Sequence, residues 1–333
     1  MRQLTLGPAE VQEKRSASGI YGRRFKMRHA KTITVLVLLI SLLALAATAT
    51  GIFTEEGPGA YAYTSIRGQE VLIYGKGLYQ HMSAEVAPQG IAQDVVTLFI
   101  GIPLLLLSLV LSRRGSLAGS YLLTGTIGYF LVTYLFYTVM GMYNALFLVY
   151  VALLAASFFG FILALRSLPS ANTNTYFHAH TPVKLAGGFL MIAAVAIGLL
   201  WLSIIVPPLA DGVVVPLQVE HYTTLVVQGL DLGILLPAAF VAGRLLVHKY
   251  DAGYLLAPVY LVFLSILMTA LTAKVIAMAL LGYNVFPVVI IIPLFNLTAI
   301  MCAVLLLRSI NKSKAVRVET SAVAKSSKRT HSS

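Results

Sequence analysis

Charged side chains stand inside stretches of sequence that are otherwise apolar, and they are the residues best suited to chemistry. Asp231 lies in "HYTTLVVQGLDLGILLPAAF" (221–240), and Lys274 lies in a second apolar stretch at 254–281. An unpaired charge near the centre of a bilayer costs ~2.5–3.5 kcal/mol, so such residues usually face a bundle interior or a watery cavity. Each charge is about seven residues, or roughly 10 Å, from one end of its stretch. We therefore expect Asp231 and Lys274 to be able to pair.

Polar residues around Asp231 recur at helical spacing. His221, Thr224, Gln228 and Asp231 are three, four and three residues apart, which places them along one stripe of a helix. Glu220 stands at the start of the stripe. We predict a substrate or proton pathway from six residues: Asp231, Lys274, Gln228, His221, Glu220 and Asp94.

Three roles for these residues are open. In a structural role, Asp231 and Lys274 pair and the polar stripe holds helices together. In a transport role, Asp231 titrates in a cavity that is open to the outside. In a catalytic role, several side chains near the outer face act as an acid and a base, or bind a metal. The catalytic set would be His81, Asp94, Glu220, His221 and Asp231.

No motif with a fixed spacing supports a cofactor. The sequence has no Walker A loop, no HExxH, no dinucleotide fingerprint and no pair of histidines fit for haem. His178 and His180 lack a nearby third metal ligand. Tyr129, Tyr134 and Tyr137 are better explained by interface position and core packing than by a cofactor site. We therefore assign no catalytic residue, no metal ligand and no cofactor.

The composition is that of a chain dissolved in lipid. Of the 333 residues, 58% are hydrophobic and 11% are charged, with a mean hydropathy of +0.86. A soluble domain has about 25% charged residues, so this chain lacks the polar side chains to cover a surface that faces water. The single cysteine, Cys302, excludes an intramolecular disulfide.

Eight apolar stretches approach the roughly 20 residues that a helix needs to cross a bilayer. None shows the period-2 alternation of a barrel strand, so an all-α membrane protein with eight transmembrane helices is predicted. The first stretch, with "ALAATATG" near its end, could alternatively be a cleaved signal peptide. The stretches lie near 31–53, 93–112, 118–140, 145–166, 185–207, 224–245, 254–281 and 286–308.

The basic residues predict the orientation. With the N-terminus inside, cytoplasmic segments hold 21 of the 24 Lys and Arg residues, which is a positive-inside pattern. Both termini are then cytoplasmic, and the protein lies in the cell (cytoplasmic) membrane. The basic tails, 1–30 and 309–333, are expected to be disordered and to attract anionic lipids of the inner leaflet. The net charge of +12 is explained by these flanks, so no nucleic acid partner is expected.

The sequence indicates an internal duplication. "DVVTLFIGIPLLLLSLVLSRRGSLAGSYLL" (94–123) and "DLGILLPAAFVAGRLLVHKYDAGYLL" (231–256) share an Asp, a Pro, basic residues and Tyr-Leu-Leu in order. We predict two parallel four-helix repeats, 31–166 and 185–308, joined by a cytoplasmic linker at 167–184. Chance similarity between apolar helices is the alternative.

The longest outside segment, residues 54–92, contains "EVLIYGKGLY". Val71, Ile73 and Tyr79 fit short strands around Gly75 and Gly77, which predicts a small extracytoplasmic hairpin after the first helix. Such a hairpin is either a structural lid or a loop that binds an outside ligand.

"RGQEVLIYGKGLY", "DVVTLFIGIPLLLLSLVLSRRGSLAGSYLL" and "MYNALFLVYVALL" resemble a group of uncharacterised prokaryotic multi-span membrane proteins. The resemblance covers roughly residues 60 to 160, with a weaker stretch at "QGLDLGILLPAAFVAG", and it implies a membrane location without a known activity. We expect a polytopic membrane protein that transports a small solute or links transport to protons. A non-catalytic membrane partner, scaffold or sensor subunit and an intramembrane enzyme are the alternatives.

Overall fold

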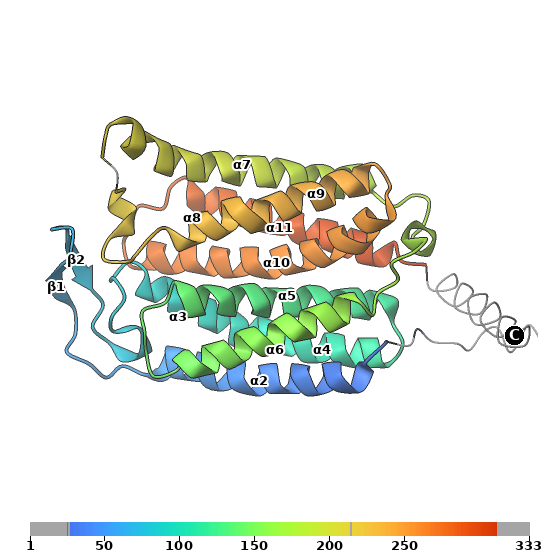
Figure 1. The fold of residues 1–333 in the computed structure, drawn as a ribbon, viewed down its shortest axis with the longest axis horizontal. Helices are drawn as coiled ribbons and strands as arrows, with labels where there is room; N and C mark the ends of the chain where they lie inside the picture. The colour runs from blue at the N-terminus through green and yellow to red at the C-terminus, as the bar shows by residue number, and fades with distance from the viewer. Residues whose placement is uncertain (1–24, 26, 214, 312–333) are drawn as a thin grey trace, which may run out of the picture.

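The computed structural model describes residues 25, 27–213 and 215–311, and it is an all-α membrane protein (Figure 1). Eight helical stretches among these residues are long and apolar enough to cross a bilayer, which confirms the predicted fold class. Most of the two basic tails lies outside the described residues. The helices are α2 (Ala30–Phe53), α3 (Ala87–Val96) with α4 (Ile102–Arg113), α5 (Leu117–Val139), α6 (Phe147–Leu165), α7 (Val183–Ala210), α8 (Val226–Leu230) with α9 (Leu236–Val247), α10 (Asp251–Leu280) and α11 (Val288–Arg308).

The second span begins earlier than its apolar run suggested. Helix α3 starts at Ala87, with a proline in its first turn, where the missing N–H costs no helical hydrogen bond. Its first two turns carry glutamines, which is why the hydropathy pattern placed the start near residue 93. Asp94 therefore lies about 10 Å inside the span. The sequence had placed it at the mouth of a span that starts near residue 93.

Two spans are interrupted by a π-helical segment. Thr97–Gly101 separates α3 from α4, and Asp231–Leu235 separates α8 from α9. Each segment ends two residues before a proline, Pro103 or Pro237. Because proline cannot donate to the preceding turn, a local widening of the helix accommodates it, and such π segments are frequent at functional sites.

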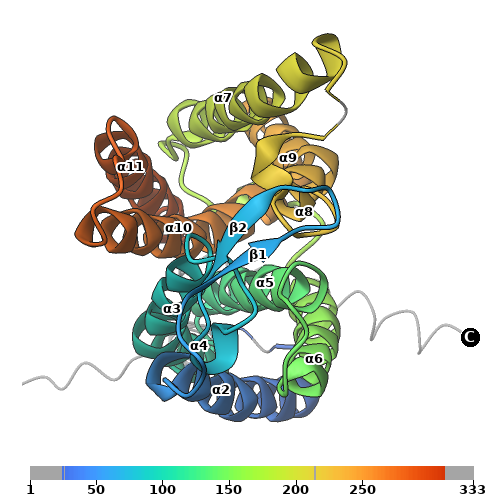
Figure 2. The same cartoon turned by 90° about the vertical axis from the view of Figure 1, so that its left-hand side faces the viewer.

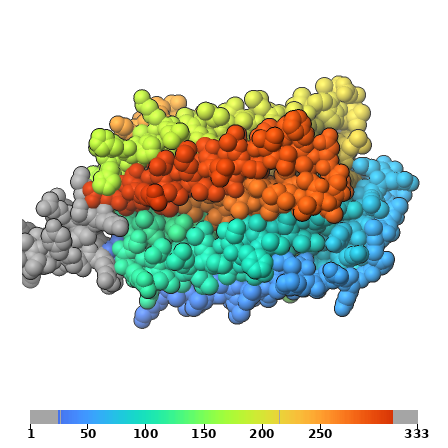
Figure 3. Space-filling model, turned by 180° about the vertical axis from the view of Figure 1, so that it is seen from behind, coloured from blue at the N-terminus to red at the C-terminus, as the bar shows by residue number. Residues whose placement is uncertain are grey.

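The helices form two groups that meet along α5 and α10. Seen end-on, α2 to α6 gather on one side and α7 to α11 on the other, with α10 between α5 and the rest of its own group (Figure 2). Helix α10 packs on α5 and α3 of the first group and on α9 and α11 of its own. The space-filling view shows α10 and α11 lying directly against the first group without a break in the surface (Figure 3). The largest buried side chains, including Tyr121, Tyr129 and Tyr134 of α5, are in the shared core.

A two-stranded hairpin covers one end of the bundle, which we call the hairpin end (Figure 1). Strand β1 (Tyr61–Thr64) pairs antiparallel with β2 (Glu70–Ile73). The predicted hairpin is present, but its expected turn is wrong, because β2 pairs with an upstream strand and Tyr79 lies in the 3-10 turn Gly77–Tyr79. A Cβ at Gly77 would overlap the backbone of Thr54, so this segment folds back onto the end of α2 and cannot continue a ladder.

The predicted linker closes the opposite end of the bundle. The backbone N–H groups of Asn172 and Asn174 donate to the carboxylate of Asp251, the first residue of α10, at 2.8 and 3.1 Å. The His178 N–H donates to the Ser309 carbonyl oxygen at 2.9 Å. The first residues of α2 and the last of α11 also lie at this end, so the described chain starts and finishes on the same side (Figure 1).

Candidate functional site

Asp94 is the most deeply buried carboxyl group among the described residues, with 1% of its side chain exposed. The Tyr79 hydroxyl donates to Oδ2 at 2.5 Å, and the Tyr137 hydroxyl donates to Oδ1 at 3.0 Å. A Cβ at Gly51 of α2 would collide with Oδ2, so only glycine leaves room for the carboxylate there. Three elements that are distant in the sequence therefore enclose one acid.

A second layer of polar groups surrounds this acid. The amide of Gln93 donates to the Tyr129 hydroxyl at 2.8 Å, and the Thr97 hydroxyl lies 2.7 Å from the same oxygen. Gln93 Oε1 and the Tyr134 hydroxyl are buried and have no hydrogen-bond partner among the described residues. Buried polar atoms of this kind cost free energy unless a water or a proton satisfies them. The cluster thus has spare hydrogen-bonding capacity beside a carboxylate.

Lys274 of α10 brings a positive charge to the cluster from the second group of helices. The charges of Lys274 and Asp94 are near enough to attract each other through space, without a direct ion pair between the two side chains. Lys274 is half-buried and lies about 9 Å from the end of α10, at a depth similar to that of Asp94. The sequence led us to expect a pair with Asp231 instead. That expectation assumed that consecutive spans supply each other's partners, whereas α10 also packs against α3 of the other group.

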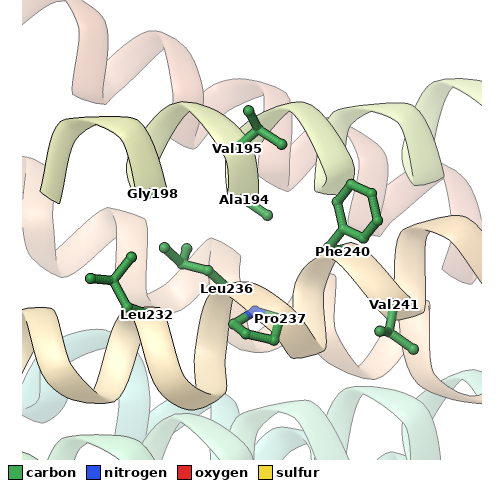
Figure 4. Close-up of a pocket in the computed structure, with 8 residues that line it drawn as sticks. All are labelled: Ala194, Val195, Gly198, Leu232, Leu236, Pro237, Phe240 and Val241. Atoms are coloured by element: carbon green, nitrogen blue, oxygen red, sulfur yellow. The ribbon is translucent and has the colours of Figure 1, made fainter. Parts of the chain in front are cut away.

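Asp231 has a neutral partner. Its Oδ2 accepts a hydrogen bond from the indole Nε1 of Trp201 on α7 at 2.8 Å. The side chain is half-buried, as is that of Gln228 one turn earlier. Figure 4 shows an apolar groove close by, between α7 and α9, lined by Ala194, Val195, Gly198, Leu232, Leu236, Pro237, Phe240 and Val241.

Only two residues of the predicted polar stripe, Gln228 and Asp231, lie in a helix. Helix α8 begins at Val226, so His221 and Thr224 lie in the preceding loop and do not continue the stripe of Gln228 and Asp231. The His221 side chain instead contacts the chain that follows the hairpin, because its Nε2 lies 3.0 Å from the His81 carbonyl oxygen. The spacing rule fails because it presumes that the helix extends through the loop.

The hairpin clamps both groups of helices. Arg67 in its turn donates to the carbonyl oxygens of Glu220, Tyr222 and Thr223 at 3.2, 2.9 and 3.3 Å. Three carbonyls on one guanidinium fix the loop before α8 to the segment that carries Tyr79.

Replacing Arg67 with alanine should loosen this clamp and leave the helices folded. We expect faster amide hydrogen exchange in 61–73 and in 217–225, with little change within α5 or α10, because the lost bonds lie outside the spans. An Arg67→Lys variant is the matched control, because its single ammonium group can bond to only some of the three carbonyl oxygens. Unchanged exchange in both segments would contradict the clamp.

Glu85, Glu70 and Glu220 line a cavity of about 180 Å³ beneath the hairpin. Partial burial of the Glu85 carboxyl group raises its pKa above 4.5, and the nearby charge of Glu220 raises the pKa further. The folded state therefore holds the Glu85 proton more tightly than the unfolded state does. The stability from this group is present below pH 4.5 and is lost as the pH rises through the folded-state pKa.

Glu85→Gln should flatten the fall in stability that begins as the pH rises above 4.5, because the neutral amide cannot ionise. The measurement is detergent-solubilised unfolding across that pH range. Glu220→Gln should shift the fall to lower pH without abolishing it. A wild-type profile that rises with pH and is unchanged by Glu85→Gln would contradict the assignment.

No group of three or more His, Cys, Asp or Glu side chains in the described part of the chain could hold a metal ion. His178 and His180 lie in the linker, away from the hairpin end. His81, Glu220 and His221 gather under the hairpin, whereas Asp94 and Asp231 lie within separate spans. The five residues of the catalytic alternative are therefore divided among three places.

Sequence reasoning missed Tyr79, Gln93 and Thr97 as members of the site. Tyr79 was assigned to a strand, and the two polar residues stood outside or at the edge of the expected span. A usable signal was the Gln93-Asp94 pair just before an apolar run, since two adjacent polar residues that enter a bilayer need internal partners.

Comparison with protein-family models, with curated proteins and with solved structures finds no match for this chain. The function is therefore inferred from the cluster around Asp94.

Proposed function

We propose that this protein is a proton-linked transporter of a small solute in the cytoplasmic membrane of a prokaryote, with Asp94 as the proton-binding group. The observation that carries the proposal is a carboxyl group buried within a span, held by Tyr79 and Tyr137 and faced by Lys274 of the opposite helix group. Ionisable residues at such positions are typical of proton relays in transporters.

Protonation of Asp94 changes the contact between the two helix groups. The ionised carboxylate attracts Lys274 and accepts from both tyrosine hydroxyls; the neutral acid loses the attraction and much of the acceptor strength. The arrangement of α3 against α10 that suits one protonation state is therefore less favourable in the other. A proton taken up at Asp94 can shift the population of two arrangements, which is the physical requirement for coupling.

The two helix groups are best explained as repeats of one four-helix unit. Features of the first group recur after 134 residues, the offset from Thr97 to Asp231: the π segment, the proline behind it, and a left-handed residue, Gly115 or Lys249. Farther along, Asn144 and Asn284 each accept, through Oδ1, from the backbone N–H two residues later. A repeat whose units run in the same direction across the membrane is a common transporter plan.

This offset changes which residues correspond. It places Gln228 opposite Asp94 and Asp231 opposite Thr97, whereas the sequence comparison aligned the two aspartates. The second unit then holds a neutral amide where the first holds the proton-binding acid. That asymmetry fits a single proton site in a duplicated fold.

The basic residues support placing the hairpin end outside and both termini in the cytoplasm. The basic tails would then meet anionic lipid of the inner leaflet. Reporter fusions at residues 65 and 330 test this orientation, and activity of both reporters in the same compartment would overturn it.

Proton coupling is tested in proteoliposomes that contain a pH-sensitive dye and carry an inside-negative potential. Amines, amino acids, sugars and organic acids are added in turn. We expect at least one class to drive solute-dependent acidification in the wild type and not in Asp94→Asn. The double variant Asp94→Asn/Lys274→Met is the control for misfolding, because it leaves neither charge in the span without its partner. If no solute moves protons faster in the wild type than in these variants, proton-linked transport is rejected.

A further inference from the structure

We propose that the groove between α7 and α9 binds a membrane-dissolved aliphatic amine, with its alkyl chain in the groove and its ammonium group at Asp231. This binding site is separate from Asp94 and does not depend on the transport proposal.

The groove is shaped for a single apolar chain. Its volume is about 300 Å³ and all eight residues that line it are apolar or glycine. Ligand pockets span roughly 300–1,000 Å³, so this volume is at the low end of that range and suits one chain in preference to two. At Gly198 an added Cβ would make only ordinary contacts, 3.8 Å from Leu236 and 4.0 Å from Leu232. Ala194 of α7 and Leu236 and Phe240 of α9 point into the space between the two helices (Figure 4).

A polar pair lies just beyond one end of the apolar groove. Trp201 follows Gly198 by one helical turn, and Asp231 directly precedes Leu232, so the Trp201–Asp231 hydrogen bond lies at the end nearer the hairpin. The indole donor is neutral, so it supplies no counter-charge when Asp231 is ionised. A carboxylate within the hydrocarbon is costly without a counter-charge. An aliphatic amine meets both requirements, because its alkyl chain fills the apolar groove and its ammonium group neutralises the carboxylate.

The depth of the site favours a simple amine over a phospholipid. Gly198 lies near the middle of the 28-residue helix α7, and Asp231 is about one turn, or 5 Å, nearer the hairpin end. The hydrocarbon is roughly 30 Å thick, so Asp231 is on the order of 10 Å below its surface. The ammonium of a phospholipid is tied to the headgroup layer, whereas that of an alkylamine can follow its chain inward.

Trp201 makes the proposal testable, because it is the one tryptophan in the sequence. Dodecylamine is titrated into the full-length protein in nanodiscs of phosphatidylcholine and phosphatidylglycerol, and Trp201 fluorescence is recorded. We expect a saturable change in emission, and an affinity weaker by about tenfold or more in Asp231→Asn. Asparagine keeps an acceptor for the indole, so the starting emission should be preserved.

Dodecanol, which has the same chain without the charge, should bind at least about tenfold more weakly than dodecylamine. Gly198→Leu should abolish the dodecylamine response by filling the groove. Gly188→Leu is the matched control on α7, since Gly188 faces open space and its variant should respond as the wild type does. Equal affinities for dodecanol and dodecylamine, an unaffected Asp231→Asn variant, or the same emission change on adding phosphatidylethanolamine alone would each overturn the proposal.

Discussion

Replacing Lys274 with methionine should destabilise the protein by about 2–3 kcal/mol, and adding Asp94→Asn should recover most of that loss. The single change leaves Asp94 buried without its counter-charge, although the hydroxyls of Tyr79 and Tyr137 remain. Asp94→Asn alone should also destabilise, because it leaves an unpaired ammonium group in the span. Removal of both charges restores neutrality.

The measurement is a double-mutant cycle on unfolding in mixed detergent micelles. Interaction energies above about 0.5 kcal/mol identify residues that act on each other. A second cycle with Asp231→Asn and Lys274→Met is the matched control, and its effects should add, because Asp231 is held by Trp201. Coupling in the Asp231 cycle with additivity in the Asp94 cycle would restore the pairing that the sequence suggested.

The fold could be predicted because its cause is local. Each span is a run of about 20 apolar residues, and a backbone in lipid must satisfy its hydrogen bonds within the segment. The hairpin was also foreseeable from the glycines and alternating residues after α2. Its pairing was not, because the partner strand Tyr61–Thr64 is wholly exposed and carries no alternation of buried and exposed side chains.

The candidate site could not be predicted because its members meet through packing between distant segments. Tyr79 comes from the hairpin segment, Asp94 from α3, Tyr137 from α5 and Lys274 from α10. Sequence reasoning gave Asp231 priority because it stands deeper in an apolar run. In the structure, α3 begins with two polar turns that precede the apolar run, so Asp94 lies inside the span.

The contact between α5 and α10 depends on the absence of a side chain at Gly125. A Cβ there would lie 2.5 Å from the Val262 Cβ and 2.7 Å from the Val259 carbonyl oxygen. Neither atom is the end of a flexible side chain, so no rotamer change relieves the overlap. Small residues that let helix backbones approach are typical of membrane interfaces, where packing replaces the hydrophobic effect.

Gly125→Ala should destabilise the protein by about 1–3 kcal/mol, although alanine is the better helix former by about 1 kcal/mol. Gly125→Leu should separate the two helix groups and prevent the native state from forming. Because α10 would be displaced from α5, Lys274 would also move relative to Asp94, and the coupling in the Asp94–Lys274 cycle should shrink in a Gly125→Ala background.

Gly128→Ala is the matched control, one turn along the same helix. Its Cβ would lie 3.3 Å from the edge of the Phe161 ring, which can shift by a small rotation. We expect Gly128→Ala to be close to neutral in the same micelle unfolding measurement. If both alanine variants behaved alike, the close approach at Gly125 would not hold the two groups together. The coupling of Asp94 to Lys274 would then need another support, because among the glycines of α5 and α10 only Gly125 lies this close to the backbone of the other helix.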